Sequence, residues 1–148
     1  MRRKINNMQI RIFENEVPAE ARKIRTEVFV DEQGFCDEFD PTDCVATHFV
    51  LFDDGGTPIA TSRVFRAEAQ GSFFIGRIAV IASMRGKGLG KRIVAASEDY
   101  IRSVGGKQAL IHAQSRVADF YANIGYTEFG ERDEEQGCPH VWMQKKIQ

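Results

Sequence analysis

The chain has 148 residues, 43% of them hydrophobic, which is enough for one globular domain to bury a core without disulfides. Its 20 Lys and Arg residues against 21 Asp and Glu residues give a net charge of −1, which excludes a global positive field that would attract nucleic acid or an anionic membrane. The three cysteines form no Cys-x-x-Cys pair, and no apolar segment approaches the length of a membrane span. We therefore expect one cytoplasmic domain over residues 1–148, with reduced thiols and neither a nucleic-acid nor a membrane partner.

The N-terminal half predicts strands around a single helix. Alternating apolar and polar residues predict the first strand, and Pro18 then suits the start of a helix whose apolar positions Ala21, Ile24 and Val28 follow at near-helical spacing. A turn rich in Asp and Gly separates the next two apolar runs, which predicts a hairpin. A fourth run, rich in β-branched and aromatic residues, leads into a glycine-rich segment. The strands expected in this half cover residues 8–13, 48–52, 59–65 and 73–81.

The C-terminal half predicts two helices and three strands. Apolar residues recur at three- and four-residue intervals from Leu89 to Val104, and Gly105 and Gly106 supply a stop after this long helix. A shorter helix is expected over residues 117–124. The strands expected in this half cover residues 109–113, 126–129 and 141–147. The whole pattern indicates an α+β fold, in which an antiparallel meander is interrupted by helices.

The glycine-rich segment 85–90 (Arg-Gly-Lys-Gly-Leu-Gly) joins a predicted strand to the long helix. Free backbone N–H groups and the positive end of the helix dipole meet at such a junction, and glycines let the backbone approach a phosphate closely. The Walker pattern fails, because three residues instead of four lie between Gly86 and Gly90, and Arg92 replaces the hydroxyl that binds magnesium. The dinucleotide pattern Gly-x-Gly-x-x-Gly fails as well, since position 91 is Lys. A pyrophosphate of another kind fits the segment, although such turns also join strands to helices without a ligand.

Two motifs carry a resemblance to a known family. Arg85, Gly88 and Gly90 form Arg-x-x-Gly-x-Gly, which resembles the acyl-CoA signature of the GNAT superfamily of N-acyltransferases. The later segment 120–126, Phe-Tyr-Ala-Asn-Ile-Gly-Tyr, resembles a second motif of that superfamily at the expected distance. The resemblance covers nearly the whole chain. It implies a mixed, mostly antiparallel central sheet of about six to seven strands flanked by helices, and an N-acetyltransferase that uses acetyl-CoA or another short acyl-CoA.

The resemblance also assigns roles to residues. In such proteins the pantetheine arm pairs with the backbone of the cofactor strand, the pyrophosphate lies on the glycine loop, and the tyrosine at the position of Tyr121 protonates the departing CoA thiolate. From the sequence alone Tyr121 would be read as a core aromatic, and the motif reverses that preference. Gln114 suits a contact to the cofactor arm and equally a polar strand end. The expected cofactor-binding residues are Ile78, Ala79, Val80, Arg85, Gly86, Lys87, Gly88, Leu89, Gly90, Lys91 and Gln114.

The acceptor side is less defined. Many relatives carry a glutamate on the cofactor strand, yet residues 73–77 contain no carboxylate, so no general base carries over. Glu32 is the candidate we select for that role. It belongs to an acidic cluster without Lys or Arg, which suggests a cationic small-molecule or peptide amine as substrate and equally suits a solvated loop. The cluster consists of Asp31, Glu32, Asp37, Glu38, Asp40 and Asp43.

Histidines and cysteines offer further candidates. His48 and His140 titrate near neutrality and could act as bases, although each more often packs or lies at the surface. Cys44 with His48, or Cys138 with His140, makes a weak zinc pattern, and we expect no metal. Direct transfer to an amine needs no acyl-enzyme, so the thiols, including Cys36, are expected to be ordinary.

Two other functions are considered. Arg25 and Phe29 with Glu38 and Asp40 resemble the early region of acyl-homoserine-lactone synthases, but a 148-residue chain leaves little room for their acyl-chain pocket. A non-catalytic acyl-CoA sensor would keep the glycine loop and could dispense with Tyr121 and the acidic cluster. The identity of the amine stays open, as does the oligomeric state; homodimers are common in the superfamily.

Overall fold

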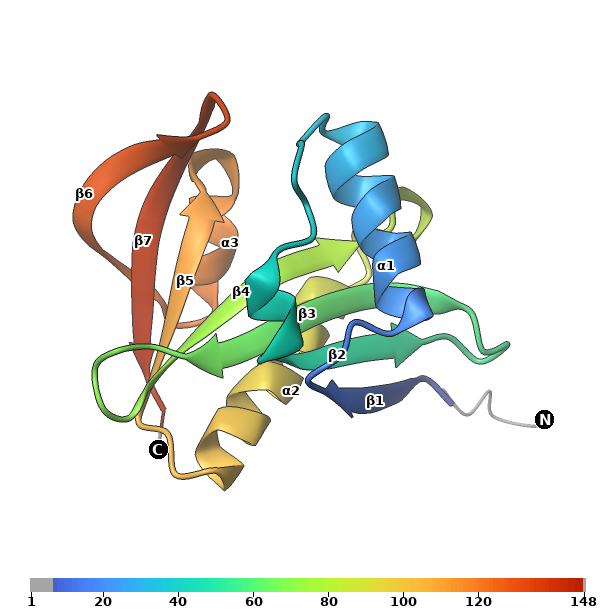
Figure 1. The fold of residues 1–148 in the computed structure, drawn as a ribbon, viewed down its shortest axis with the longest axis horizontal. Helices are drawn as coiled ribbons and strands as arrows, with labels where there is room; N and C mark the ends of the chain where they lie inside the picture. Colours follow the sequence, from blue (N-terminus) through green and yellow to red (C-terminus); the bar gives the residue numbers. More distant parts are fainter. Residues whose placement is uncertain (1–6, 148) are drawn as a thin grey trace.

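The computed structural model describes residues 7–147, which form one seven-stranded sheet with helices on both faces (Figure 1). The strands are β1 (Gln9–Glu14), β2 (Thr47–Phe52), β3 (Pro58–Arg66), β4 (Ser72–Val80), β5 (Gln108–Gln114), β6 (Thr127–Glu135) and β7 (Cys138–Lys146). The helices are α1 (Ala19–Arg25), its π-helical continuation η1 (Thr26–Glu32), α2 (Leu89–Ser103) and α3 (Ala118–Asn123), with 3₁₀ turns η2 (Pro41–Cys44), η3 (Ala82–Met84) and η4 (Ser115–Val117). None of these helices is long and apolar enough to cross a membrane.

The sheet order is β1-β2-β3-β4-β5-β7-β6, and every neighbouring pair is antiparallel except β4 with β5. This confirms the predicted α+β fold with a mixed, mostly antiparallel sheet. The expected hairpin forms between β2 and β3, where the Asp53 carboxylate accepts the N–H groups of Gly55 and Thr57 at 2.9 and 2.8 Å.

The closing hairpin is longer than the sequence predicted. β6 continues through the polar residues 130–135, and β7 already begins at Cys138 instead of Val141. The side chains of residues 130–135 are exposed, so no apolar alternation marks this part of the strand. Pairing with β7 makes it a strand, and this extension brings Glu135 beside the start of β7.

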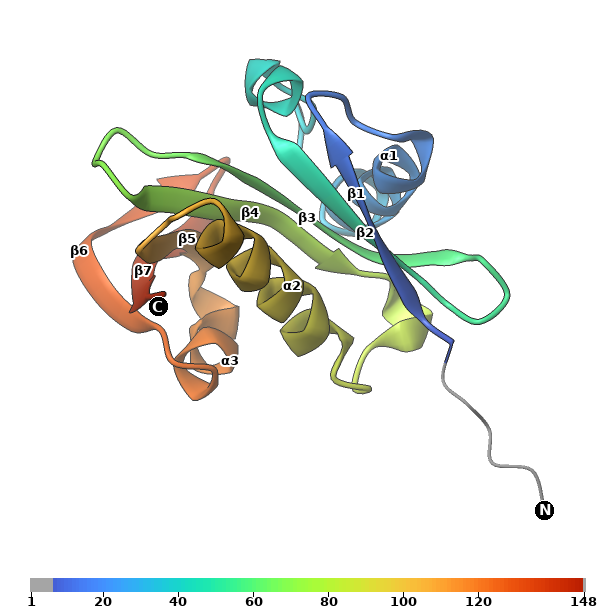
Figure 2. The same cartoon turned by 90° about the horizontal axis from the view of Figure 1, so that it is seen from below.

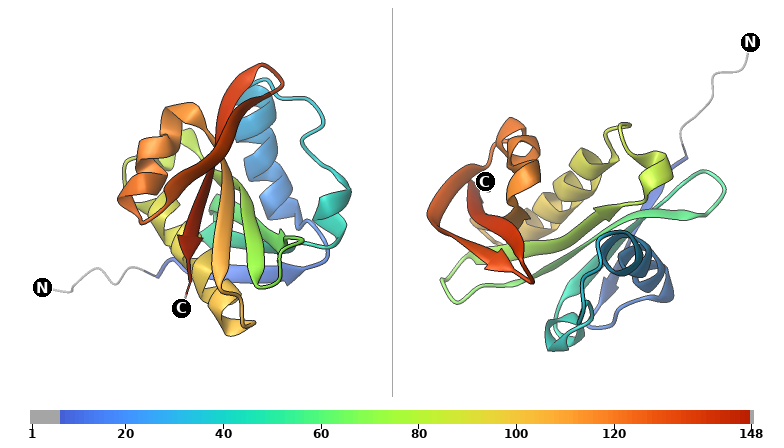
Figure 3. Two further views of the ribbon diagram at one scale, coloured as in Figure 1. Left: turned by 90° about the vertical axis from the view of Figure 1, so that its left-hand side faces the viewer. Right: turned by 90° about the horizontal axis from the view of Figure 1, so that it is seen from above.

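The helices cover opposite faces of the sheet. α2 and α3 lie on one face and α1 with η1 on the other (Figures 2 and 3). All six residues of β2 are buried: Phe49 and Leu51 join the core under α2, while Val50 and Phe52 join the core under α1. A strand buried on both faces reads as a continuous apolar run, which is how this segment appears in the sequence.

Candidate active site

A cavity opens where the two parallel strands diverge. β4 and β5 pair only from Ser72 to Phe74 and from Gln108 to Leu110, and beyond these residues they splay apart (Figure 1). The space between them is a cavity of about 390 Å³, lined by residues 75–80 of β4 and 111–114 of β5. Because β5 does not pair with this part of β4, the β4 edge there has no strand neighbour on the cavity side within residues 7–147.

A β-bulge shapes the cavity edge of β4. Thr61 of β3 pairs with Ala79 and Arg63 pairs with Gly76, so that one residue of β3 opposes Arg77 and Ile78. Arg77 has a φ of 48°, in the left-handed region that few residues other than glycine adopt. Bulges re-aim backbone and side chains beside functional sites. This one lies in the middle of the strand that the sequence assigned to the cofactor.

The glycine-rich segment forms a loop at the N-terminus of α2. Gly86 and Gly88 have φ values of 78° and 76°, and a Cβ at either position would meet no atom within 4 Å, so backbone conformation and not crowding requires glycine there. Gly88 is the N-cap residue of α2, and no side chain caps the amides of the first turn. Uncapped amides at a helix N-terminus suit an anion, and binding of a pyrophosphate by this segment stays a prediction.

Gly90 is needed for a different reason. A Cβ at Gly90 would lie 3.1 Å from Cζ of Phe120, so the glycine lets α3 pack closely against the start of α2. The side chain of Leu89 is buried in the core, which leaves its backbone amide as the part available to a ligand. Lys87 and Lys91 are exposed beside the loop.

Tyr121 lies on α3, lines the cavity and is only 7% exposed. Its ring contacts the rings of Phe120 and Tyr126. No hydrogen bond to its hydroxyl is found among residues 7–147. Burial raises the pKa of Tyr121 well above its usual value of 10.0, so the hydroxyl keeps its proton at any physiological pH.

Glu32 and Arg85, which the sequence assigned to catalysis and to the cofactor, form a bidentate ion pair with each other. The two Arg85 nitrogens donate to the Glu32 carboxylate at 2.6 and 2.8 Å. The hydrogen bond and charge of Arg85 lower the pKa of Glu32, which weakens it as a base. The pair links η1 to the glycine loop.

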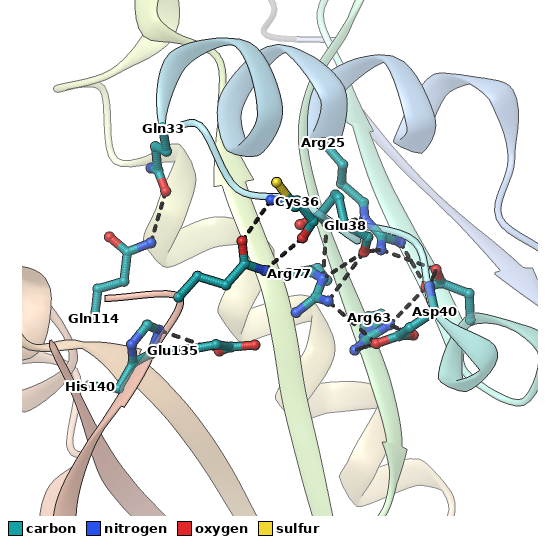
Figure 4. A network of polar contacts seen from close by, with 12 residues as sticks. Arg25, Gln33, Cys36, Glu38, Asp40, Arg63, Arg77, Gln114, Glu135 and His140 are labelled. Carbon is teal, nitrogen blue, oxygen red and sulfur yellow. Dashed lines mark hydrogen bonds and ion pairs between the residues drawn. The ribbon is translucent and has the colours of Figure 1, made fainter. Parts of the chain in front are cut away.

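Three members of the acidic cluster are bound to arginines and are not a free acidic surface. Glu38, Asp40 and Asp43 alternate with Arg25, Arg63 and Arg77 in one network of ion pairs (Figure 4). The sequence showed no basic residue within this segment because the arginines come from α1, β3 and the β4 bulge. Burial by itself raises the pKa of Asp43, but the hydrogen bonds and charge of Arg25, with those of Arg63, outweigh it and lower the pKa to about 2.

The side chains of Gln114 and Gln136 form hydrogen bonds across the cavity to the segment after η1. Gln114 donates to Gln33 at 2.8 Å and accepts from Arg116 at 2.9 Å, so the residue expected to contact the cofactor arm already has protein partners. Gln136, in the β6–β7 turn, accepts from the backbone N–H of Cys36 at 2.7 Å and donates to its carbonyl at 2.6 Å (Figure 4). These contacts join the segment after η1 to the strands on the opposite side of the cavity.

The two candidate histidines have different locations. His48 is buried against the Asp43 carbonyl, outside the cavity lining, while His140 lines the cavity. Sequence reasoning missed His112 and Glu135, which line the cavity beside His140, and it missed Arg77 as a partner of Glu38. All three are polar residues within strands, and no local sequence pattern distinguishes them.

Comparison with known proteins decides the family. The model of the acetyltransferase (GNAT) domain matches residues 19–147. The chain belongs to the GNAT acetyltransferase family. Proteins of this family transfer acyl groups from acyl-CoA.

Relatives of this GNAT domain are known from sequence and structure. A Bacillus subtilis (strain 168) protein assigned as an acetyltransferase is 36% identical over 131 residues, covering 85% of this chain and 87% of the relative. The structure of an N-acetyltransferase from Lactobacillus plantarum superposes with a TM-score of 0.86 at 29% identity, covering 95% of this chain and 99% of the other. An acyl-CoA N-acyltransferase from Pseudomonas aeruginosa has a TM-score of 0.82 at 21% identity, covering 94% and 99%, and shows a shared fold.

Proposed function

We propose that this GNAT domain is an acetyl-CoA-dependent N-acetyltransferase, in which a primary amine attacks the thioester directly in a ternary complex. One observation carries the proposal: a single cavity brings together the unpaired edge of β4, the glycine loop and the buried hydroxyl of Tyr121. The β4 edge suits the extended pantetheine arm, the glycine loop suits the pyrophosphate, and the Tyr121 hydroxyl suits a proton donor.

The donor would occupy the β4 side of the cavity. Its pantetheine arm would pair with the backbone of Ile78, Ala79 and Val80, as an added strand pairs with a free sheet edge. Its pyrophosphate would accept hydrogen bonds from the backbone N–H groups of residues 86–91 at the start of α2. Backbone N–H groups near the bulge would polarise the thioester carbonyl.

The acceptor would enter from the opposite side, where acidic groups face the cavity. Asp37 is exposed at the cavity wall and has no charged partner among residues 7–147, and Glu135 lines the same cavity. Such groups favour a cationic amine. The amine gives up a proton as the C–N bond forms, the C–S bond breaks, and Tyr121 protonates the sulfur. Of the two candidate bases, His140 lines the same cavity, whereas Glu32 is held by Arg85 and is not part of the cavity lining.

The acyl-homoserine-lactone-synthase alternative is weakened by the role of its key residues. Arg25 and Glu38, on which that resemblance rests, form an ion pair with side-chain exposures of 1% and 4%. Such a pair ties α1 to the following segment, which gives both side chains a structural role that needs no acyl-homoserine-lactone chemistry.

The proposal is tested by binding and turnover in the same preparation. Calorimetric titrations with acetyl-CoA, longer acyl-CoAs and free CoA are followed by thiol release against monoamines, polyamines, amino acids and a lysine peptide. We expect acetyl-CoA to bind at one site per chain, with thiol release for at least one cationic amine. Binding without release for any amine would favour the sensor, release only with long acyl donors would favour the synthase, and absence of binding would overturn all three readings.

Replacing Gly88 with glutamate is expected to lower acetyl-CoA affinity roughly 100-fold or more, because a carboxylate at the start of α2 repels the pyrophosphate. Gly56→Glu is the matched control: Gly56 also has a positive φ, of 82°, and open space around its Cβ, but lies in the β2–β3 turn. Both variants should lose similar stability in thermal unfolding, and only Gly88→Glu should lose affinity in calorimetry. Equal affinities for the two variants would place the pyrophosphate elsewhere.

A further inference from the structure

Two histidines and a glutamate meet at the end of the cavity formed by β5, β6 and β7. His112 pairs across the sheet with Trp142, so His140, two residues before Trp142 on β7, lies on the same face and diagonally beside His112. Their ring centroids are 4.5 Å apart. Glu135, the last residue of β6, pairs with Cys138, and its side chain lies beside His140 (Figure 4).

The carboxylate lies midway between the two imidazoles. One oxygen, Oε2 of Glu135, is 3.7 Å from Nδ1 of His112 and 3.7 Å from Nε2 of His140. Both separations exceed hydrogen-bonding distance. One donor atom from each of the three residues lies within 4.8 Å of the others, and this is the one such group among residues 7–147.

The outer nitrogens of both rings are held by acceptors. Nε2 of His112 is 2.6 Å from a carboxylate oxygen of Asp133, and Nδ1 of His140 is 2.8 Å from the carbonyl of Cys138. A carboxylate and a carbonyl only accept, so these outer nitrogens carry the protons. With the protons on the outer nitrogens, the inner nitrogens are the ones that can present lone pairs toward the Glu135 carboxylate.

Three electron-pair donors that face one another repel unless a cation lies between them. The outer hydrogen bonds are also those that orient metal-binding histidines, with a carboxylate or a carbonyl behind each ring. Tetrahedral ligands of zinc at 2.0–2.2 Å lie about 3.3–3.6 Å apart. Side-chain movements of up to about 0.4 Å would close the two 3.7 Å gaps, and the two inner imidazole nitrogens, which lie within 4.8 Å of each other, would have to move closer by up to about 1.5 Å.

We propose that His112, Glu135 and His140 bind a divalent transition-metal cation of the zinc class. Two imidazoles and one carboxylate make a three-ligand set, and all three residues line the cavity, which leaves a fourth coordination position open toward it. This proposal differs from the expectation of no metal in the sequence analysis. There, Cys138 was the one partner considered for His140. The site does not depend on the proposed transferase activity, although its open position faces the space assigned to the acceptor.

The test uses cobalt(II) as a spectroscopic probe and zinc(II) as a competitor, in the absence of any CoA. The full chain carries Cys36→Ser, Cys44→Ser and Cys138→Ser, because exposed thiols would themselves bind these metals. We expect one cobalt per chain with the intense visible absorption of a four- or five-coordinate site, displaced by one equivalent of zinc. Absence of this absorption, together with no zinc binding by calorimetry, would overturn the proposal.

Variants locate the metal. Glu135→Gln and His112→Asn change partly exposed side chains and should each weaken zinc binding at least about tenfold, the range found for lost ligands or their supports. Glu134→Gln is the matched control, since the neighbouring residue of β6 points to the other face of the strand. Circular dichroism verifies that each variant is folded. Equal zinc affinities in all three variants and the parent would place the metal elsewhere and overturn the assignment.

Discussion

Tyr121→Phe is expected to lower kcat roughly 100-fold or more while leaving the acetyl-CoA dissociation constant within about threefold, because the hydroxyl acts only when the sulfur departs. Tyr121 is buried in the cavity wall without a hydrogen-bond partner among the described residues, and burial raises its pKa, so the group remains a proton donor. The measurements are thiol release at saturating acetyl-CoA and calorimetric affinity.

Tyr100→Phe is the control for this experiment. Tyr100 lies on α2 and its hydroxyl accepts a hydrogen bond from Thr47 at 3.1 Å, outside the cavity lining, so kcat should be unchanged. The pH profile adds a second readout. Since the pKa of Tyr121 is raised above 10.0, the wild type should show no loss of turnover from tyrosine ionisation up to about pH 10. Undiminished kcat in Tyr121→Phe would remove this residue from proton transfer.

Asp43→Asn is expected to destabilise the fold by about 3 kcal/mol, since it removes the one carboxylate that binds both Arg25 and Arg63. This loss in the free energy of unfolding lies at the low end of the roughly 3–5 kcal/mol expected for a broken buried ion pair. The reason is that Glu38 still pairs with Arg25 and Asp40 still pairs with Arg63. For a chain of this size the loss corresponds to a fall in Tm of roughly 6–12 °C. Thermal and denaturant unfolding measure it.

Asp99→Asn is the matched control for Asp43→Asn. Asp99 pairs with Arg102 at 2.8 Å, but the two side chains are 78% and 45% exposed, so its loss should cost less than about 0.5 kcal/mol. Equal effects of the two substitutions would mean that the arginine network does not stabilise the fold.

The same network has a pH signature. The pKa of Asp43 in the folded chain is about 2, below its ordinary value of 3.8, so its stabilisation is complete above that ordinary value and is lost as the pH falls toward 2. The shift corresponds to roughly 2 kcal/mol. Asp43→Asn should therefore show a weaker fall in stability between pH 4 and pH 2 than the wild type.

Local sequence patterns were sufficient to predict most helices and strands and the residues proposed to bind the acyl donor. Apolar patterns located the strands up to β5 and the helix α2, because α2 buries one stripe, β5 alternates buried and half-buried residues, and β2 is buried on both faces. The glycine loop was predictable because Gly86 and Gly88 have left-handed backbone conformations that glycine adopts without strain. Tyr121 was selected by its motif, and the fold places it in the cavity wall.

The acceptor side depended on contacts between residues far apart in the chain. By itself, the sequence determined the α+β architecture and the conformation of the glycine loop, because these follow from short-range periodicity and backbone preference. The choice of Tyr121 as proton donor came from the resemblance of segment 120–126 to a family motif, and it stays a prediction. Only the tertiary structure decided that three carboxylates of the acidic segment are held by arginines from other elements, that Glu32 binds Arg85, and that His112 and Glu135 join His140. Charge pairing and ligand geometry depend on strand register and on where strands diverge, and neither is encoded in the local spacing of residues.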